Sequence, residues 1–525
     1  MKSLFVKFLV FLLFCFSAKG LLAQNINLSN EEDFNGEPFL AIDPTDEQHV
    51  AVAWMGLNGL NLIQIHLRVS FDGGESWNEP HLFSHLAGYN TSADPSIDFD
   101  SDGNLYVCFI DYHISGTTGG VYIYKSEDGG ITFNEPVEVI HTEDDLGEYP
   151  VDRPWMVIDK SGTASDGNIY VTTKPAPWEP IPNRSYFIAS TDGGLSFNDW
   201  KYIDATGWSI GSFISGPMIT PSVSADGIFY CIYPSFEITE SFYPRFICAK
   251  TYDAGESFEY FLVKESTTLN SDTVLKLGYL LITDDTNPLH LAFLYILSSF
   301  GDPDIFLNES FDGGETWSDD VRVNDDTPSN DVSQDLVWAD FDQGGNLLVT
   351  WRDRRNAPDT GSLTSYEIYS AVKWKDSTSF SNNLIISDEL IAFDDVLKEN
   401  GNDFMGCVFA NDTVYAAWGD TRNGFLNIWF TKMNAKTATG TGVQNLNSRQ
   451  TTFIYPNPAV IDEPVFVNSI KKEEMLVIIY NVTGKLVMQK RIYANEPFYI
   501  EQGIEPGCYF YSIDGRENGE IIFNQ

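Results

Sequence analysis

The sequence is poor in cysteine, in histidine and in basic residues. Six Cys and seven His are spread over 525 residues, and 31 Lys and Arg residues stand against 75 Asp and Glu residues, which gives a formal net charge of −44. A chain with this negative charge repels phosphate backbones and anionic lipids. We therefore expect no nucleic-acid partner and no binding to a membrane surface. The histidines lack the paired spacing of zinc hydrolases, and no catalytic metal is expected.

The few cysteines do not form a disulfide framework. Five of them follow the amino-terminal segment, an odd number scattered within strand-like apolar runs: Cys108, Cys231, Cys248, Cys407 and Cys508. We expect these side chains to be buried as small hydrophobic groups. The alternative is a single bridge between Cys231 and Cys248, which lie where two neighbouring strands of one hairpin are expected.

A long apolar run is also missing, except at the amino terminus. Lys2 and Lys7 precede the apolar stretch Phe8 to Phe16, and Leu21-Leu22-Ala23 offers a cleavage site. This arrangement is typical of a secretory signal peptide, and the run is too short for a membrane anchor. The sequence therefore predicts that residues 1–23 are removed and that the mature protein is exported, soluble and without a transmembrane anchor.

Aromatic and turn-forming residues are abundant. The chain has 37 Phe, 25 Tyr and 12 Trp, together with 41 Gly and 24 Pro. Aromatic side chains favour strands, whereas Gly and Pro favour the turns between them. The composition therefore predicts an all-β protein built from many short strands.

One short motif, Ser/Thr-x-Asp-x-Gly-x-Ser/Thr-aromatic, occurs five times with a spacing near 60 residues. Its aspartates are Asp72, Asp128, Asp192, Asp253 and Asp312. A sixth, degenerate copy keeps Ser377, Ser379 and Phe380 but has Lys375 in place of the aspartate. Asp and Ser/Thr oxygens accept hydrogen bonds from turn N–H groups, and Gly supplies a positive φ, so the motif predicts a structural hairpin turn. A fixed period of this length is typical of a propeller or an array.

The repeats organise the chain into units of four antiparallel strands. Two apolar strands precede each motif, the third strand runs into it and the fourth leaves it, which is the pattern of a propeller blade. Counting the inner strand pairs gives seven units, of which the last, Asp403 to Met433, lacks a fourth strand. Residues 25–30 resemble a fourth strand, so we expect them to complete this blade and close the ring. Six blades is the alternative.

The repeated motif matches the Asp-box, or bacterial neuraminidase repeat, of sialidase-like β-propellers. The resemblance implies such a propeller over residues 24–434 and, with it, a glycoside hydrolase of the exo-sialidase type. Sialidases carry an Arg-Ile-Pro motif on the first strand of the first blade, but this strand reads Glu37-Pro-Phe-Leu-Ala-Ile. Arg153-Pro154, in the third unit, is the nearest equivalent. The catalytic set of the family therefore does not transfer to this chain.

The last part of the sequence reads as a separate module. A polar linker covers residues 435–452, and alternating strands follow in residues 453–525, which predicts a small β-sandwich. The elements Tyr-Pro-Asn-Pro, Tyr-Asn-x-x-Gly-Lys and Pro-Gly-x-Tyr, in this order, resemble the C-terminal sorting domain of type IX secretion substrates. The resemblance implies the type IX secretion machinery as a partner and a location outside the cell or on its outer surface.

The candidate site residues lie on the face opposite the Asp-box turns, where the longer loops gather. Aromatic platforms beside Arg and Asp suit sugars, which offer apolar ring faces and hydroxyl edges. The candidates for substrate binding are Arg153, Trp155, Trp208, Arg352, Arg354 and Arg422. The candidates for catalysis are Asp94, Asp152, Asp353 and Asp420.

No cofactor is expected, with calcium as the alternative. Asp98-x-Asp-x-Asp102-Gly103 resembles the beginning of a calcium-binding loop, but its twelfth position is Phe109 and not Glu. We interpret this segment as a turn.

Two functions remain open at this point. The first is a secreted or cell-surface sialidase-like enzyme that acts on extracellular glycans. The second is a noncatalytic surface propeller that binds glycans or proteins. In either case we expect a monomer.

Overall fold

The computed structural model describes residues 25–57, 62–150, 152–266, 278–299, 301–393 and 402–438, and most of the strands between residues 453 and 524. The predicted signal peptide and residues 439–452 of the predicted linker lie outside the described residues. The chain divides into two compact units, Met1–Thr441 and Gly442–Gln525. No helix among the described residues has the length and apolar character needed to cross a membrane.

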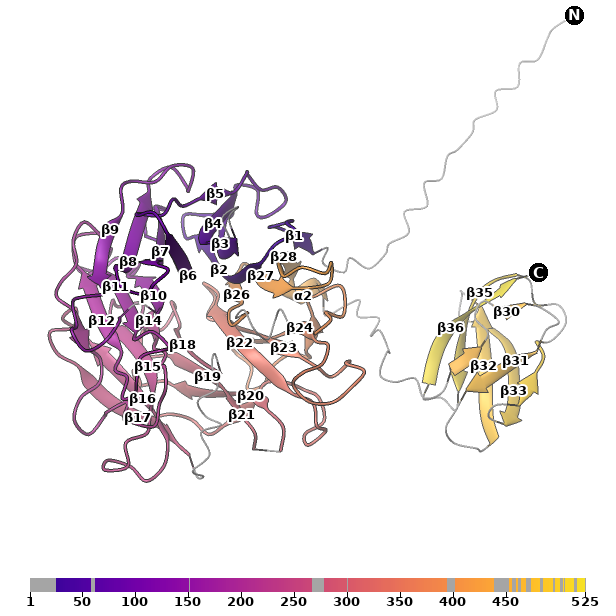
Figure 1. Cartoon of the computed structure of the whole chain (residues 1–525). Helices are drawn as coiled ribbons and strands as arrows, with labels where there is room; N and C mark the ends of the chain where they lie inside the picture. Colours follow the sequence, from indigo (N-terminus) through magenta and orange to yellow (C-terminus); the bar gives the residue numbers. More distant parts are fainter. Residues whose placement is uncertain are drawn as a thin grey trace, which may run out of the picture. The chain divides into compact units, whose positions relative to one another are not determined.

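The first unit contains seven four-stranded antiparallel sheets, and the innermost strands contact one another in cyclic order. Figure 1 shows the sheets following one another around a common centre, from β2 in indigo to β27 in orange. The innermost strands are β2 (Asn35–Asp43), β6 (Asn90–Phe99), β10 (Asp152–Ile158), β14 (Thr220–Val223), β18 (Tyr279–Thr283), β22 (Gln334–Phe341) and β26 (Gly406–Ala410). This arrangement confirms the prediction of an all-β propeller with seven blades.

The other strands follow outward in each blade. The second strands are β3 (Asp46–Leu57), β7 (Leu105–His113), β11 (Ile169–Lys174), β15 (Phe229–Ser235), β19 (Leu291–Leu297), β23 (Leu347–Asp353) and β27 (Thr413–Asp420). The third strands are β4 (Ile63–Ser70), β8 (Gly119–Ser126), β12 (Tyr186–Ser190), β16 (Arg245–Thr251), β20 (Asp304–Ser310), β24 (Glu367–Lys373) and β28 (Asn427–Asn434). The outer strands are β5 (His81–Leu82), β9 (Val137–His141), β13 (Lys201–Tyr202), β17 (Glu259–Glu265), β21 (Val321–Arg322), β25 (Leu384–Ile385) and β1 (Ile26–Asn27).

The seventh blade takes its outer strand from the other end of the propeller sequence. β1 pairs antiparallel with β28, with Ile26 opposite Phe430 and Asn27 opposite Trp429. The amide of Leu28 then donates a 2.8 Å hydrogen bond to the carbonyl of Ile428. The predicted closure of the ring is confirmed, and it removes an open sheet edge from the last blade.

The Asp-box turns form one repeated hydrogen-bond pattern. In the first, the Ser70 hydroxyl accepts a 2.8 Å bond from the Gly74 amide, and Asp72 accepts a 2.8 Å bond from the Ser76 amide. The bonds from Ser76 lower the pKa of Asp72 to about 2. A side chain at Gly74, where φ is 87°, would lie 2.5 Å from the ring of Phe430 in the preceding blade. The Asp-box turns therefore pack each blade against its neighbour.

An aromatic plug fills the centre of the ring. It consists of Phe39, Trp155, Trp338 and Phe404, from the first, third, sixth and seventh blades. The two indoles stack with their centroids 5.2 Å apart, and Phe39 packs edge-on against both at 5.8 and 5.3 Å. Because these rings meet on the axis, they divide the central channel into two ends. We call the end beside the long loops the loop face, and the other end the Asp-box face.

The described cysteines do not form disulfides. Cys231 on β15 and Cys248 on β16 lie on adjacent strands, as expected, but both remain free thiols, like Cys108 and Cys407. The alternative of a single bridge is therefore wrong. All four are buried, and the loss of solvent raises the pKa of the Cys108 thiol above its ordinary range. Burial as small hydrophobic groups is confirmed for these four residues.

The segment after the propeller begins with a short helix, α2 (Ala435–Ala438), where the sequence predicted only a linker. The second unit contains two sheets. One has β29 (Phe453–Tyr455), β31 (Val465–Asn468) and β34 (Pro497–Phe498); the other has β30 (Ala459–Val460), β36 (Glu517–Asn524), β35 (Gly507–Ile513), β32 (Glu474–Asn481) and β33 (Leu486–Tyr493). Val477, Ile479 and Ile521 belong to its hydrophobic core and are fully buried. The second unit is thus a small all-β module.

Closure of the ring depends on a residue outside the sheet ladder. The Leu28 side chain is fully buried between Val52 and Trp54 of the first blade and Ile428 and Phe430 of the seventh. We expect Leu28→Ala to lower the free energy of unfolding of the propeller by about 3 kcal/mol, because a buried cavity forms at the junction of the first and last blades. Chemical denaturation measures this change.

The matched control is Leu146→Ala, at a leucine that is 96% exposed. We expect a change below about 0.5 kcal/mol at that position. An equal effect of both substitutions would contradict the role of Leu28 in closing the ring.

Candidate functional site

Four innermost strands carry a β-bulge at the end that points to the loop face. The ladder shifts between Gly36 and Phe39, between Ala93 and Ser96, between Asp152 and Trp155, and between Asp335 and Trp338. The first residue of each bulge has a left-handed backbone: Glu37 (φ 54°), Asp94 (φ 53°), Arg153 (φ 52°) and Leu336 (φ 56°). Each such residue costs of the order of 1 kcal/mol, and bulges redirect side chains. The bulges therefore place three ionisable side chains at one level of the ring.

Arg153 connects the blades across this level. Its guanidinium pairs with Asp403 of the seventh blade and lies 3.9 Å from the carboxylate of Glu37 in the first. Its backbone amide donates a 3.1 Å hydrogen bond to Asp94 of the second blade. The guanidinium carbon lies 4.9 Å from the centre of the Phe404 ring, so Arg153 rests on the aromatic plug. One residue thus links four blades directly above the plug, three of them through its side chain.

Glu37 and Asp94 form a carboxyl pair with opposite pKa shifts. Burial raises the pKa of Glu37 well above its ordinary value, and the charge of Asp94 adds to this shift against the opposing effect of Arg153. Burial also acts on Asp94, but the charge of Arg153 and the hydrogen bond from the Arg153 amide contribute to outweighing it, so the pKa of Asp94 is lowered. One buried oxygen of Glu37 has no hydrogen-bond partner among the described residues. The surroundings of Glu37 therefore favour its neutral form over its charged form.

Asp152 is the second carboxyl group with a raised pKa. Burial raises the pKa of Asp152 to about 6, Lys174 opposes this shift, and the charge of Asp94 adds to it. Its carboxylate pairs with the ammonium group of Lys174. The side chain of Asp152 is 13% exposed, against 3% for that of Glu37.

Two further arginines hold one aspartate. Arg352 donates to both oxygens of Asp335, from Nε at 2.5 Å and from Nη2 at 2.9 Å. Arg354 donates to the same carboxylate at 2.9 Å. The two guanidinium charges overcome the effect of burial and lower the pKa of Asp335 to about 2. The positive charges at this end of the channel are thus already balanced by carboxylates of the protein.

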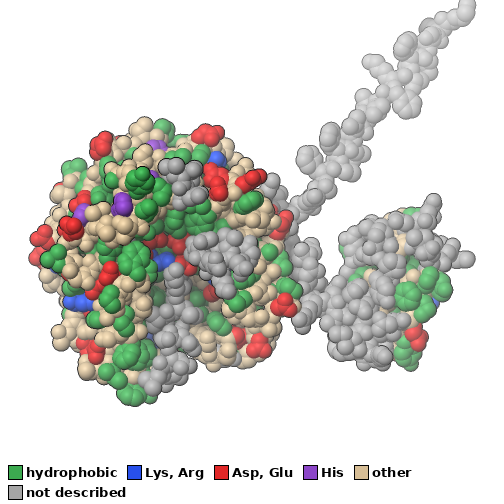
Figure 2. All heavy atoms as spheres, viewed as in Figure 1, with side chains coloured by type: hydrophobic (Ala, Val, Ile, Leu, Met, Phe, Trp, Pro, Cys, Tyr) green, Lys and Arg blue, Asp and Glu red, His purple; other side chains and the backbone are tan. Residues whose placement is uncertain are grey.

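An aromatic rim lies beside the charged cluster. Trp178, in the loop after β11, is 55% exposed. Its ring centre lies 6.3 Å from that of Tyr112 and 5.9 Å from that of Tyr149. Burial raises the pKa of Tyr112, and the charges of Asp94 and Asp152 raise it further. The aromatic rim is therefore close enough to interact electrostatically with the charged cluster. In the space-filling view, acidic and basic side chains lie side by side in the hollow at the centre of the ring (Figure 2).

The structure brings together only part of the predicted site. Asp94, Asp152 and Arg153 meet above the plug, Arg352 and Arg354 join the same end of the channel through Asp335, and Trp155 forms part of the plug beneath them. The contribution of Asp403 to the raised pKa of Arg352 links the two halves of the cluster. We call this set, with Glu37, Lys174, Asp335 and Asp403, the loop-face cluster.

The other candidates lie elsewhere. Asp353 is fully buried and accepts hydrogen bonds from Arg355 and from the Trp351 indole at 2.8 Å, so it cannot meet a substrate. Successive side chains of β23 point to opposite faces of the sheet, which separates Asp353 from Arg352 and Arg354. Asp420 is buried in the same way against Arg422 and the indole of Trp418. Trp208 stacks on Tyr260, in the outer strand of the fourth blade.

Sequence reasoning missed four members of the loop-face cluster: Glu37, Lys174, Asp335 and Asp403. Glu37 had a usable signal, because Glu37-Pro38 repeats the dipeptide pattern of Asp94-Pro95 and Arg153-Pro154 at the same position of its blade. The described residues contain no group of three or more His, Cys, Asp or Glu side chains arranged to hold a metal ion. In the segment considered for calcium, Asp98 pairs with Lys160, and Asp100 accepts the hydrogen bonds of its own turn.

The carboxyl pair gives a direct test of the protonation states. We expect Glu37→Gln to leave the stability at pH 7 unchanged or raised, because the raised pKa of Glu37 means that its buried charge is unfavourable and Gln has none. Asp94→Asn should lower the free energy of unfolding by about 3 kcal/mol, because it removes the carboxylate whose charge opposes that of Arg153 and that accepts the Arg153 amide. Asn tolerates a left-handed backbone, so this change adds no strain at that position.

The pH dependence of the free energy of unfolding tests the direction of the Glu37 pKa shift. The folded pKa of Glu37 lies above its ordinary value of 4.5, so the native protein loses stability as the pH rises above that value. The advantage of Glu37→Gln should therefore grow from pH 4.5 towards neutral. Denaturation curves at several pH values measure it, and a loss of stability in Glu37→Gln that increases with pH would contradict the raised pKa of Glu37.

Comparison with known proteins identifies the second unit. Residues 453–522 match the family model of the secretion system C-terminal sorting domain, which confirms the resemblance seen in the sequence. Such a domain is the sorting signal of type IX secretion, so the protein is one that is secreted or held at the outer cell surface. No curated protein matches the sequence.

Solved structures similar to the chain include several proteins of low identity. A protein of unknown function from Dyadobacter fermentans is 15% identical with a TM-score of 0.42, and the match covers 78% of this chain and 98% of that one. A Hadza microbial sialidase is 12% identical with a TM-score of 0.41, and the match covers 79% of this chain and 69% of that one. The GH93 α-L-arabinofuranosidase of Fusarium graminearum is 10% identical with a TM-score of 0.44, and the match covers 79% of this chain and 98% of that one.

Similarity at this level carries no conclusion about the activity of this chain. The described residues of the first unit form a seven-bladed β-propeller, and the second unit is a type IX secretion sorting domain.

Proposed function

We propose that the propeller is a secreted or cell-surface module that recognises extracellular glycans at its loop face. The observation that carries this proposal is the exposed Trp178, in contact with Tyr112 and Tyr149, beside the loop-face cluster. An aromatic ring stacks on the apolar face of a sugar, while neighbouring charged groups bind its hydroxyls. The cluster offers both donors and acceptors, which suits hydroxyl groups that both donate and accept.

The charge balance of the cluster favours a neutral sugar over an acidic one. Arg153 faces Asp403 and Glu37, and Arg352 and Arg354 share Asp335. A sugar carboxylate would have to displace these internal partners and leave a half-buried aspartate unpaired, which is unfavourable. The strong negative charge of the whole chain opposes the approach of an acidic polysaccharide as well. The geometry therefore supports a neutral glycan and not a sialoside.

The carboxyl groups favour recognition over hydrolysis. Glycoside hydrolases commonly hold their two carboxyl groups about 5–9.5 Å apart, with the substrate bond or a water molecule between them. Glu37, Asp94 and Asp152 instead shift one another's pKa as close neighbours, and Asp94 and Asp152 are occupied by the Arg153 amide and the Lys174 ammonium group. One observation supports hydrolysis as the second candidate: Asp152, partly exposed and with a pKa of about 6, has the properties of a general acid.

A glycan screen separates these functions. We expect the purified protein to bind neutral polysaccharides or oligosaccharides in a glycan array and to release no reducing sugar from them. Release that is lost in Asp152→Asn would favour the hydrolase. Binding of sialosides alone, or of no glycan, would overturn the proposal.

Trp178 gives the most direct test of the site. We expect Trp178→Ala to weaken binding of the glycan found in the screen about tenfold, or ~1.4 kcal/mol, because the sugar loses its stacking partner. The matched control is Tyr252→Ala, at an aromatic residue that is 61% exposed in an Asp-box turn on the other face. Titration calorimetry measures both, and equal weakening by the two substitutions would place the glycan elsewhere.

Export gives a separate prediction. We expect a periplasmic reporter fused to residues 453–525 to leave a cell that has type IX secretion and to stay in the periplasm of a cell that lacks it, because these residues carry the sorting signal. Immunoblots of medium, outer surface and periplasm measure the distribution. A reporter retained in the periplasm of both cells would show that these residues are not sufficient for export.

A further inference from the structure

The Asp-box face of the channel contains a cavity that the proposed function does not use. Its volume is about 290 Å³, and residues of all seven innermost strands line it. Phe39, Trp155 and Trp338 of the aromatic plug are part of its lining. The plug therefore lies between this cavity and the loop-face cluster, so the two ends are chemically separate. The volume approaches that of pockets for small organic ligands, about 300 Å³ and above.

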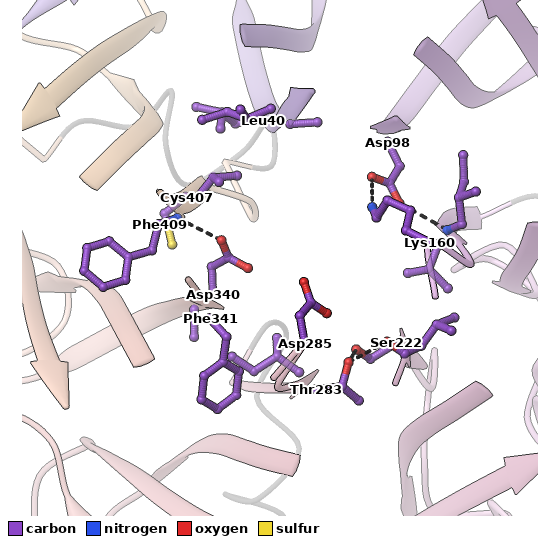
Figure 3. Close-up of a pocket in the computed structure, with 18 of the residues that line it drawn as sticks. Leu40, Asp98, Lys160, Ser222, Thr283, Asp285, Asp340, Phe341, Cys407 and Phe409 are labelled. Carbon is purple, nitrogen blue, oxygen red and sulfur yellow. Dashed lines mark hydrogen bonds and ion pairs between the residues drawn. The ribbon is translucent and has the colours of Figure 1, made fainter. Parts of the chain in front are cut away.

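One wall of the cavity carries polar groups that bind one another. Lys160 donates a 2.6 Å hydrogen bond to Asp98, whose other oxygen accepts from the amide of Ile158 at 3.1 Å. The hydroxyls of Ser222 and Thr283 lie 2.8 Å apart in a hydrogen bond. These pairs are visible on the right and lower right of Figure 3. The lysine on this wall is therefore neutralised by its neighbour.

Among the described residues, no cation forms an ion pair with the two carboxyl groups on the remaining wall, although the charge of Lys160 acts on both from its pair with Asp98. Figure 3 shows Asp285 and Asp340 with their carboxyl groups directed into the cavity. Asp340 accepts one hydrogen bond, 2.8 Å from the amide of Phe409, and among the described residues none donates a hydrogen bond to Asp285. Asp340 is half-buried and Asp285 is exposed, and partial desolvation in the cavity raises the pKa of both groups, that of Asp340 to about 8. A positive charge from outside the chain would stabilise both in their ionised form.

The remaining lining determines the kind of cation. No group of His, Cys, Asp and Glu side chains among the described residues has the arrangement of a metal site. The walls between the polar groups are apolar, with Leu40, Ile97 and Leu281 among them, and the inner end is formed by the two indoles. A ligand that fits must therefore combine one positive group with an apolar body.

We propose that this cavity binds a small organic ammonium ion, with its charged group on Asp285 and Asp340 and its apolar body towards Trp155 and Trp338. The site is independent of the glycan site, because the plug separates the two. An aromatic body gains most, because it packs against the aromatic lining of Phe39, Trp155 and Trp338 and the ammonium group gains two charged acceptors.

Phenethylamine serves as the probe, and 2-phenylethanol is its neutral counterpart. Titration calorimetry of the full chain at pH 8 should show saturable binding of phenethylamine and at least tenfold weaker binding of 2-phenylethanol. Asp285→Asn and Asp340→Asn should each weaken phenethylamine binding at least tenfold. Asn keeps the size of the side chain and, at position 340, the acceptor for the Phe409 amide, and the unfolding midpoint checks that the variants fold.

Asp102→Asn is the matched control, because it removes the same charge from an exposed turn between β6 and β7 on the same face. It should leave phenethylamine binding unchanged. Equal binding of amine and alcohol, equal loss in all three variants, or no saturable binding to the native protein would each overturn the proposal. A failure of this test would leave the glycan proposal unaffected, because Trp178 and the loop-face cluster lie beyond the plug.

Discussion

The pairing of β1 with β28 is the constraint on which the rest of the propeller depends. Two ladder residues and the bond from Leu28 to Ile428 join segments that lie 400 residues apart in the chain. The contacts extend beyond the ladder, because the Asn25 side chain donates to the Ile386 carbonyl and accepts from the Asp388 amide in the sixth blade. Closure fixes how closely the innermost strands approach the axis, and with it which side chains meet there.

What meets on the axis is set by position along the innermost strands. At the loop-face end, bulges with left-handed backbones turn Glu37, Asp94 and Arg153 towards each other. At the middle level aromatic rings form the plug, and beyond it Asp98 and Asp340 belong to the lining of the cavity. Because the plug is apolar, charges on one side do not share hydrogen bonds with those on the other. One channel thus presents two chemically different ends.

The sequence predicted the fold to the level of blades, because each Asp-box is a local turn whose residues act within five positions of one another. Closure was also predictable, since the last unit lacked a strand and residues 25–30 resembled one. The candidate site was harder to predict from the sequence. Arg153 and Asp403 are 250 residues apart, and only the ring brings them together. The run from Arg352 to Arg355 looked like one cluster, but the alternation of the strand sends Asp353 and Arg355 away from the axis.

The balance of charge within the site is more informative than its number of charged residues. A chain with a net charge of −44 has few cations, yet three arginines and Lys174 gather at one end of one channel. If their purpose were to hold an anionic ligand, their carboxylate partners would compete with it at every guanidinium. Glu37 shows the opposite adjustment: burial and the charge of Asp94 raise its pKa, which favours its neutral form and reduces the excess of negative charge around Arg153. The cluster is thus close to neutral and rich in oriented dipoles, which is the environment that sugar hydroxyls require and that a free carboxylate does not.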